Sequence, residues 1–215
     1  MHTTPLEALV REGFGAIGTA PSEGVVAQFM VYIRELRRWN ETINLTGYTR
    51  EREIVGKLFV DSLAWTKAVG QATSCAMLDI GSGAGFPGIP ISIVSPQHGM
   101  TLLEPNLKKV AFLHHLTGLL GLTNVRVESS SVEQFARQQD VRGKFDWVLM
   151  KALRLSVGLP YVSSLLSVSG HCALWRAHPV AADLNPDEFS VIREMPYELP
   201  FGFGKRLLSI VGRRQ

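Results

Sequence analysis

A glycine-rich stretch between Leu78 and Pro90 constrains the fold of this chain of 215 residues more than any other feature. It reads LDIGSGAGFPGIP and continues a short apolar run that begins at Cys75. Its four glycines and two prolines weaken both helix and strand propensity, so the stretch is expected to be a turn. The sequence therefore predicts a buried strand that ends in a loop whose bare backbone approaches a ligand.

Short apolar runs alternate with helical stretches along the chain after Cys75. The runs that follow CAMLDI are MTLLEP, VRVES, FDWVLM and HCALWR, and the last helical stretch between them covers residues 157–170. This alternation indicates a parallel α/β sheet with right-handed crossovers. At the end of the chain, FSVIREMPYEL and KRLLSIVGR are joined only by PFGFG. These two runs predict a terminal hairpin that adds an antiparallel strand to the sheet.

Residues 1–72 are expected to form a helical extension that packs on the sheet domain of residues 73–215. Apolar residues recur at helical spacing over residues 22–40 and 51–70. Ser22 is a suitable N-cap for the first of these helices, and Gly70 suits the end of the second.

The charge, the cysteine count and the hydropathy of the chain indicate which classes of partner are possible. A net charge of +3 and a pI near 9.0 permit a polyanionic partner without requiring one. The two cysteines, Cys75 and Cys172, have no metal-ligand spacing, so we expect buried thiols and no metal. No apolar run approaches the roughly 20 residues that span a bilayer, and no signal peptide is recognisable. We expect a cytoplasmic monomer with no membrane partner.

The register of the glycine loop bears on its ligand. The strand ends at Ile80, so a dinucleotide-binding fingerprint would start with Gly81 and Gly83. In that register Gly85 is followed by Phe86, which stands where the third glycine is required. A tight loop beside a bulky residue instead favours a nucleoside without phosphates, such as S-adenosylmethionine.

Three acidic residues support an adenosine ligand. Glu104 ends the second strand, where a carboxylate accepts hydrogen bonds from ribose hydroxyls, of a nicotinamide dinucleotide as well as of S-adenosylmethionine. Asp79 ends the first strand and is expected to contact the ammonium group of a methionine moiety or a bridging water. Glu133 follows the third strand, where an adenine amino group would lie, although the pattern SSSVEQ is also capping chemistry.

Several segments together resemble the bacterial RsmG (GidB) family. Members of this family methylate N7 of a guanosine in small-subunit (16S) ribosomal RNA with S-adenosylmethionine. The resemblance implies a Rossmann-like class I methyltransferase fold with a seven-stranded sheet. The matching segments occur in family order and are RRWNETINLTGYT, KLFVDSL, LDIGSGAGFPGIPISI, LLEPNLKKVAFL and FDWVLMKAL.

The resemblance also implies cofactor contacts, and it shows two departures from the family pattern. The family usually has arginine where this chain has Lys151, and lysine lacks the planar fork of arginine. Arg154, three residues later, is an alternative carrier of that fork. The second departure is Leu58, where the family often has histidine. The contacts implied by position are at Gly81, Phe86, Val132, Glu133 and Lys151.

Methylation of guanine N7 requires few specialised catalytic residues. N7 has an in-plane lone pair and no proton, so no general base is obligatory and positioning can carry the catalysis. The chain lacks the Asp/Asn-Pro-Pro-aromatic motif that grips amino groups of adenine and cytosine. We expect the reacting centre to be formed by Lys151, Arg154 and Asp61.

Basic clusters predict the RNA-binding surface. Lysine and arginine commonly recognise the O6/N7 edge of guanine and neutralise phosphates. Two readings stay open beside the methyltransferase: a nicotinamide-dependent oxidoreductase, and a non-catalytic relative that binds adenosine or RNA. The last strand is bracketed by Lys205-Arg206 and by Arg213-Arg214. The candidates for RNA binding are Arg34, Arg37, Arg38, Asn44, Thr46, Lys57, Lys205 and Arg206.

Overall fold

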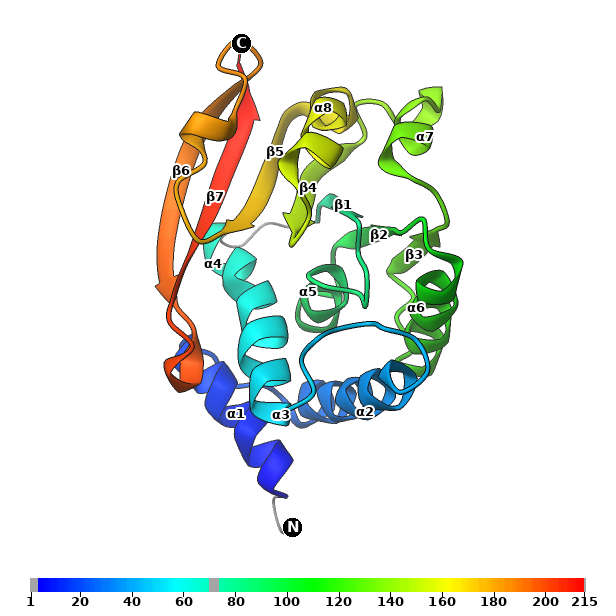
Figure 1. Ribbon diagram of the computed structural model, residues 1–215, viewed down its shortest axis with the longest axis vertical. Helices are drawn as coiled ribbons and strands as arrows, with labels where there is room; N and C mark the ends of the chain where they lie inside the picture. The colour runs from blue at the N-terminus through cyan, green and yellow to red at the C-terminus, as the bar shows by residue number, and fades with distance from the viewer. Residues whose placement is uncertain (1–3, 70–73, 215) are drawn as a thin grey trace.

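Seven strands form one sheet in the order β3-β2-β1-β4-β5-β7-β6 (Figure 1). The first five strands pair in parallel, whereas β7 pairs antiparallel with both β5 and β6. This arrangement confirms the predicted sheet and its terminal hairpin. The computed structural model describes residues 4–69 and 74–214. The strands are β1 (Ala76–Ile80), β2 (Gly99–Leu103), β3 (Val125–Glu128), β4 (Phe145–Lys151), β5 (Leu166–Arg176), β6 (Phe189–Glu198) and β7 (Lys205–Arg213).

Helices cover both faces of this sheet (Figure 1). Within the described residues, no helix is long and apolar enough to cross a membrane. The α-helices are α1 (Pro5–Ala16), α2 (Glu23–Asn40), α3 (Glu51–Glu53), α4 (Thr66–Val69), α5 (Gly88–Val94), α6 (Leu107–Leu119), α7 (Val132–Ala136) and α8 (Leu155–Leu165). The other helices are the π-helix η1 (Ile54–Val60) and the short 3₁₀ turns η2 (Leu63–Trp65), η3 (Gln139–Val141), η4 (Ala181–Asp183) and η5 (Pro200–Gly202).

Side chains of the strands alternate between two hydrophobic clusters. On β1, Met77 belongs to the cluster beneath α1, α2, η1, α5 and α6, whereas Leu78 and Ile80 belong to the cluster beneath α7 and α8. This period of two is what a strand with both faces buried requires. The N-terminal helices therefore share a core with the sheet. The predicted boundary between residues 72 and 73 lies outside the described residues.

The N-terminal helices begin where the sequence predicts. The Ser22 side chain accepts a hydrogen bond from the backbone N–H of Val25 and caps α2, whose Phe29 and Leu36 are fully buried. Residues 51–69 form one helical segment, but η1 is π-helical rather than α-helical. Its predicted end at Gly70 is outside the described residues.

The last crossover helix is shorter than predicted. We expected helix over residues 157–170, whereas α8 ends at Leu165 and β5 begins at Leu166. Leu166 has extended dihedral angles and is completely buried opposite Phe145 on β4. Burial of this leucine in the sheet overrides the helical spacing, and the register between β4 and β5 then shifts before Trp147.

Candidate active site

The loop between β1 and α5 folds over the carboxyl end of the neighbouring strand. The backbone N–H groups of Gly81 and Ser82 both bond to the carbonyl of Leu103, at 2.8 and 3.1 Å. Gly81, Gly83 and Gly85 have φ angles of +72°, +59° and +95°. Residues with a Cβ rarely adopt these angles, so the sequence needs glycine here to turn so tightly. The loop lies at the sheet edge where α/β folds bind ligands.

The carboxylate of Glu104 ties this loop to the tip of β2. Its Oε2 accepts the backbone N–H of Gly83 at 2.8 Å, and its Oε1 accepts that of Asn106 at 2.9 Å. Each carboxylate oxygen has a second lone pair, so acceptor capacity for ribose hydroxyls remains. The ribose role stays a prediction, and Glu104 itself is buried and does not line the cavity described below.

Asp79 lies beneath the loop and is completely buried. Its Oδ2 accepts the backbone N–H of Gly88 at 3.0 Å, and its Oδ1 has no hydrogen-bond partner among the described residues. Burial raises the pKa of this carboxyl to about 7, against the opposing effects of its hydrogen bonds and of the Lys151 charge. Asp79 therefore holds the start of α5, and its predicted contact with a methionine ammonium stays a prediction.

A cavity of about 320 Å³ opens beside the glycine loop. It brings together three predicted cofactor residues, Gly81, Val132 and Glu133. Its size and its mostly apolar wall fit a nucleoside. Glu133 is half exposed and pairs with Arg137 at 2.6 Å. The other lining residues are Ile80, Leu103, Pro105, Ser130, Ser131, Leu153, Ser156, Val157 and Tyr161.

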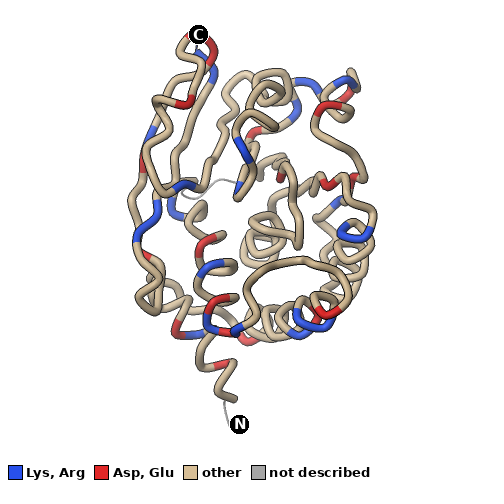
Figure 2. The backbone as a smooth tube through the Cα atoms, viewed as in Figure 1, with Lys and Arg blue, Asp and Glu red and all other residues tan. Residues whose placement is uncertain are grey.

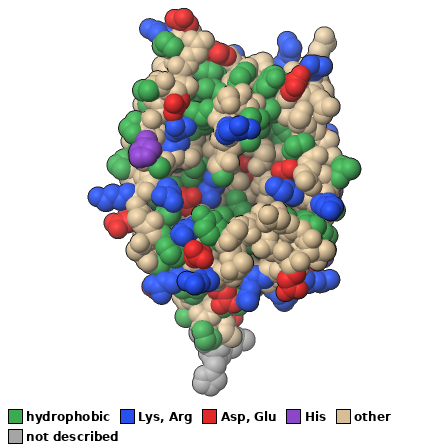
Figure 3. All heavy atoms as spheres, viewed as in Figure 1, with side chains coloured by type: hydrophobic (Ala, Val, Ile, Leu, Met, Phe, Trp, Pro, Cys, Tyr) green, Lys and Arg blue, Asp and Glu red, His purple; other side chains and the backbone are tan. Residues whose placement is uncertain are grey.

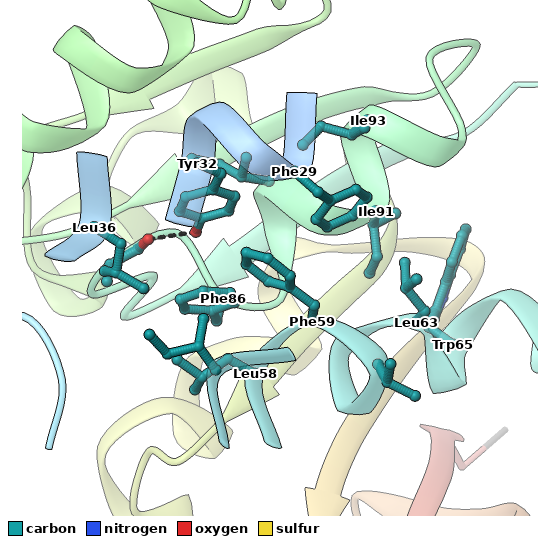
Figure 4. Close-up of a cluster of buried hydrophobic side chains, with 14 of the residues drawn as sticks. Phe29, Tyr32, Leu36, Leu58, Phe59, Leu63, Trp65, Phe86, Ile91 and Ile93 are labelled. Carbon is teal, nitrogen blue, oxygen red and sulfur yellow. Dashed lines mark hydrogen bonds between the residues drawn. The ribbon is translucent and has the colours of Figure 1, made fainter. Parts of the chain in front are cut away.

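Phe86 supports the loop from below. Its ring is 8% exposed and stacks on Tyr32 with centroids 5.2 Å apart, and Phe59 packs against both rings (Figure 4). The Tyr32 hydroxyl donates to the carbonyl of Ala84 in the loop. The Lys151 ammonium lies 5.8 Å from the Phe86 centroid. The side chain of Phe86 thus belongs to an aromatic cluster that fixes the loop, and its contact with a cofactor stays a prediction.

The structure brings together two of the three residues predicted for the reacting centre. The Lys151 ammonium lies 3.0 Å from Oδ2 of Asp61, and both side chains are 9% exposed. It also donates to the carbonyl of Lys57 at 3.1 Å. Arg154 is exposed at the start of α8 and lines neither this cavity nor the next one described, so it is not brought to the pair.

The π-helical turn of η1 makes room for this contact. In an α-helix the N–H of Asp61 would bond to the carbonyl of Lys57, four residues earlier. Here it bonds to the carbonyl of Gly56, five residues earlier, as well as to that of Leu58. The Lys57 carbonyl accepts the Lys151 ammonium instead. Such π-turns are frequent at functional sites.

A second cavity, of about 340 Å³, lies on the other side of the turn after β4. Lys151 and Ala152 line this cavity and Leu153 lines the first, so the turn of residues 151–153 borders both cavities. Sequence reasoning missed Tyr48, Trp175 and Arg176; the last two end β5, and only the rule that ligands bind at carboxyl ends of strands could have found them. The lining residues are Tyr48, Lys57, Leu58, Asp61, Lys151, Ala152, Trp175, Arg176, Ala177 and Arg206.

The predicted RNA-binding residues fall into two groups. On α2, Arg34 and Arg38 lie 3.4 and 3.6 Å from carboxylate oxygens of Glu35, and Arg37 pairs with Glu51 at 2.5 Å. In Figure 2 acidic residues lie among the basic ones of this helix. These ion pairs reduce the net charge of the group but leave the three arginine side chains more than half exposed.

The second group consists of Asn44, Thr46, Lys57, Lys205 and Arg206, of which Lys57 and Arg206 line the second cavity and the other three do not. The Lys57 ammonium lies between the rings of Tyr48 and Phe203, 4.8 and 4.5 Å from their centroids. Asn44 is exposed, and the backbone of Thr46 is held by the Asn40 side chain.

The basic residues of β7 do not form one cluster. Lys205 and Arg206 begin the strand next to the second cavity, whereas Arg213 ends it and Arg214 follows. Arg213 and Arg214 donate to the carbonyls of Ser167 and Pro186. On the face in Figure 3, Lys and Arg side chains are scattered rather than continuous.

Solved structures share the fold of this chain at low sequence identity. A ribosomal protein L11 methylase from Lactobacillus delbrueckii subsp. bulgaricus has a TM-score of 0.57 and 14% identity, covering 79% of this chain and 81% of its own. M. capricolum TrmK, in complex with S-adenosyl-homocysteine, has a TM-score of 0.55 and 14% identity, covering 72% and 68%. These similarities confirm the predicted class I methyltransferase fold.

Sequence relatives cover nearly the whole chain. A ribosomal RNA small subunit methyltransferase G from Geobacter metallireducens is 32% identical over 97% of this chain and 96% of its own length. Its counterpart from Lactococcus lactis subsp. lactis is 34% identical over 90% and 85%. The family model GidB, described as rRNA small subunit methyltransferase G, matches residues 25–202. The chain belongs to the rRNA small subunit methyltransferase G (GidB) family.

Proposed function

We propose that this protein transfers the methyl group of S-adenosylmethionine to N7 of a guanosine in 16S ribosomal RNA. One observation carries the proposal beyond family membership. A nucleoside-sized cavity and a cavity lined by basic side chains meet at residues 151–153, with the Lys151 ammonium on the basic side. A methyl donor and a target base that occupy these cavities would both border the turn after β4.

The first cavity fits S-adenosylmethionine, whose sulfonium supplies an electrophilic methyl group when bound. Gly81 lines this cavity and offers bare backbone, because an added Cβ would approach no atom closer than 3.4 Å; Gly83 lies two residues further along the loop, where the distance is 3.8 Å. Glu104 would accept the ribose hydroxyls. Val132 and Glu133 line the part of the cavity where the adenine ring would lie.

The second cavity fits a guanine that presents its Hoogsteen edge. The Lys151 ammonium is a suitable donor to O6, which leaves the N7 lone pair free to form the new bond to the methyl group. Methylation places a positive charge on the guanine ring, which a lone ammonium nearby would oppose. The Asp61 carboxylate, which lies on the cavity wall, neutralises the Lys151 ammonium. The positive charge that develops on the guanine ring is therefore not repelled by an unpaired cation.

Other transfers fit the cavities less well. Methylation of cytosine C5 needs a cysteine nucleophile, but Cys172 is completely buried, Cys75 is half-buried, and neither lines the two cavities described. Among the described residues no cluster of three His, Cys, Asp or Glu side chains could hold a metal ion. We further propose that the protein acts in the cytoplasm as a monomer, with 16S RNA or the small ribosomal subunit as its partner.

The test is methyl transfer itself. Purified protein is mixed with labelled S-adenosylmethionine and with either naked 16S RNA or small subunits, and N7 methylation is read by strand scission at the modified base. We expect one scission site. Absence of methylation on both substrates would contradict the proposal. Parallel calorimetric titrations with S-adenosylhomocysteine and NADH distinguish a methyltransferase from an oxidoreductase, because only the former binds the first ligand.

A further inference from the structure

The C-terminal hairpin reaches the reacting centre through Tyr197 on β6. The Tyr197 hydroxyl donates a hydrogen bond to Oδ1 of Asp61, which is 136 residues earlier in the chain. The other oxygen of the same carboxylate lies 3.0 Å from the Lys151 ammonium. Burial, and then the charge of Asp61, raise the pKa of Tyr197 well above its ordinary value, so the hydroxyl stays protonated and remains a donor.

The backbone of Asp61 is held as well. The indole N–H of Trp175, at the end of β5, donates to the carbonyl of Asp61 at 2.7 Å. The Lys151 ammonium also bonds to the carbonyl of Lys57. The Asp61–Lys151 pair is thus fixed from η1, from β5 and from the hairpin. Of these contacts, the one from Tyr197 fixes the rotation of the carboxylate itself.

The same hairpin contributes a residue to the target cavity. In the antiparallel register Tyr197 lies opposite Arg206, and Arg206 lines the second cavity. A strand pair that presents a cation to RNA therefore also holds the carboxylate that orients Lys151.

We propose that Tyr197 is a positioning residue for methyl transfer, which holds the Asp61 carboxylate and through it the Lys151 ammonium at the target cavity. This inference rests on the proposed function. The group that touches the base is Lys151, and Tyr197 acts on it only through Asp61.

The substitution Tyr197→Phe tests this with little disturbance of packing, because it removes one hydroxyl and keeps the ring. We expect the single-turnover rate at saturating RNA and cofactor to fall about tenfold, the equivalent of one hydrogen bond to a charged group. Affinities for RNA and for S-adenosylhomocysteine should stay within about twofold of wild type. Met195→Leu, two residues earlier on the same face of β6, is the matched control and should keep the wild-type rate.

A double-mutant comparison separates positioning from general destabilisation. In a Lys151→Met background, adding Tyr197→Phe should not slow the residual reaction further, because the group that Tyr197 positions is gone. Asp61→Asn is a second background, in which the effect of Tyr197→Phe should shrink below threefold. A full tenfold effect in these backgrounds would overturn the inference, since Tyr197 would then act independently of the pair.

Wild-type activity distinguishes this inference from the proposed function. If the wild-type protein methylates N7 and Tyr197→Phe does so at the same rate, only the positioning role fails. If the wild-type protein methylates neither naked RNA nor small subunits, the proposed function fails and the positioning role fails with it.

Discussion

The backbone N–H of Gly83 lies 2.8 Å from Oε2 of Glu104, so the loop after β1 and the acid at the tip of β2 form one hydrogen-bonded unit. The second oxygen of Glu104 bonds to the N–H of Asn106, which caps α6 through its side chain. The Glu104 carboxylate therefore stabilises the loop in addition to its proposed binding of the ribose hydroxyls. Substitutions of Glu104 should reveal both.

Glu104→Ala should weaken cofactor binding by roughly 1.5–3 kcal/mol, the range for hydrogen bonds to a charged group. Glu104→Gln should lose less, because an amide oxygen can still accept the Gly83 N–H. Both variants should affect S-adenosylmethionine and S-adenosylhomocysteine alike, since ribose is remote from the methyl group. Calorimetric titration of each variant with both ligands is the measurement, and a large difference between the ligands would contradict a ribose role.

Gly83→Val should abolish cofactor binding without unfolding the chain. The nearest atom to an added Cβ is the Gly81 carbonyl oxygen at 3.8 Å, so the protein itself leaves room. A left-handed φ of +59° costs a non-glycine residue roughly 1–2 kcal/mol, and the branched side chain would project into cofactor space.

Gly121→Val is the matched control for this loop substitution. Gly121 has a φ of +66° and open space around it, and it lies in the turn after α6. The control should lose similar stability but keep its affinity for S-adenosylhomocysteine. Unchanged affinity in a folded Gly83→Val protein would show that the cofactor does not lie against this loop.

The sheet was predictable because a strand with two buried faces has a local signature, a short continuous apolar run. The contacts that form the reacting centre have no such local signature in the sequence. Tyr197 and Asp61 are 136 residues apart, and the π-turn that frees the Lys57 carbonyl has no composition signal. A sequence also does not show whether an acid near the end of a strand faces the ligand site or the protein interior. The Asp79 side chain lies beneath the glycine loop and accepts the Gly88 N–H.

The chemistry at the turn after β4 should depend on Lys151. Lys151→Ala should lower the single-turnover rate by about a hundredfold, as expected for loss of a charged group aimed at the reacting atoms, and change RNA affinity much less. It also leaves Asp61 without its cation, so some loss of stability is expected. Lys151→Arg should keep or raise the rate, because its fork can bond the carboxylate at two points.

The comparison of the alanine and arginine variants decides the role of Lys151. If Lys151→Ala methylates at the wild-type rate, Lys151 is not at the reacting centre. Arg154 would then be the next residue to test, although it lies exposed at the start of α8. Circular dichroism and the midpoint of thermal unfolding check that each variant is folded before its rate is compared.

The two ends of β7 should differ in RNA binding. The ends of this nine-residue strand are eight steps of about 3.3 Å apart, or roughly 26 Å, and of the two ends only the one at Lys205-Arg206 adjoins the target cavity. Reversing Lys205 and Arg206 to glutamate should weaken RNA binding and flatten its salt dependence by about one unit of slope per lost phosphate contact.

Arg213 and Arg214 serve as the matched control for charge reversal at the far end of β7. They should have a smaller effect on RNA binding, because they donate to carbonyls of the protein itself. Affinity for S-adenosylhomocysteine should stay unchanged in both double variants. Filter binding at several salt concentrations is the measurement, and equal losses at the two ends would contradict a binding surface centred on the second cavity.

The buried carboxyl of Asp79 should make stability fall as the pH rises. Its pKa in the folded protein is raised to about 7 by burial, whereas an exposed aspartate titrates near 3.9. The folded state therefore binds the proton more tightly, and this contribution is complete below about pH 4 and lost as the pH rises through 7. Glu35 acts in the opposite sense, because its hydrogen bond to His115 lowers its pKa and its contribution is lost only as the pH falls.

Asp79→Asn isolates this contribution, because an amide oxygen still accepts the Gly88 N–H without carrying a charge. The free energy of unfolding is measured for both proteins by urea denaturation without cofactor. Between about pH 5 and pH 7.5, the value for the wild type minus that for the variant should fall by roughly 2–3 kcal/mol. Effects of other titrating groups, Glu35 included, cancel in this difference. Parallel curves for the two proteins would mean that the Asp79 carboxyl is already ionised at about pH 5. Its Oδ1, which has no partner among the described residues, would then be solvated by water.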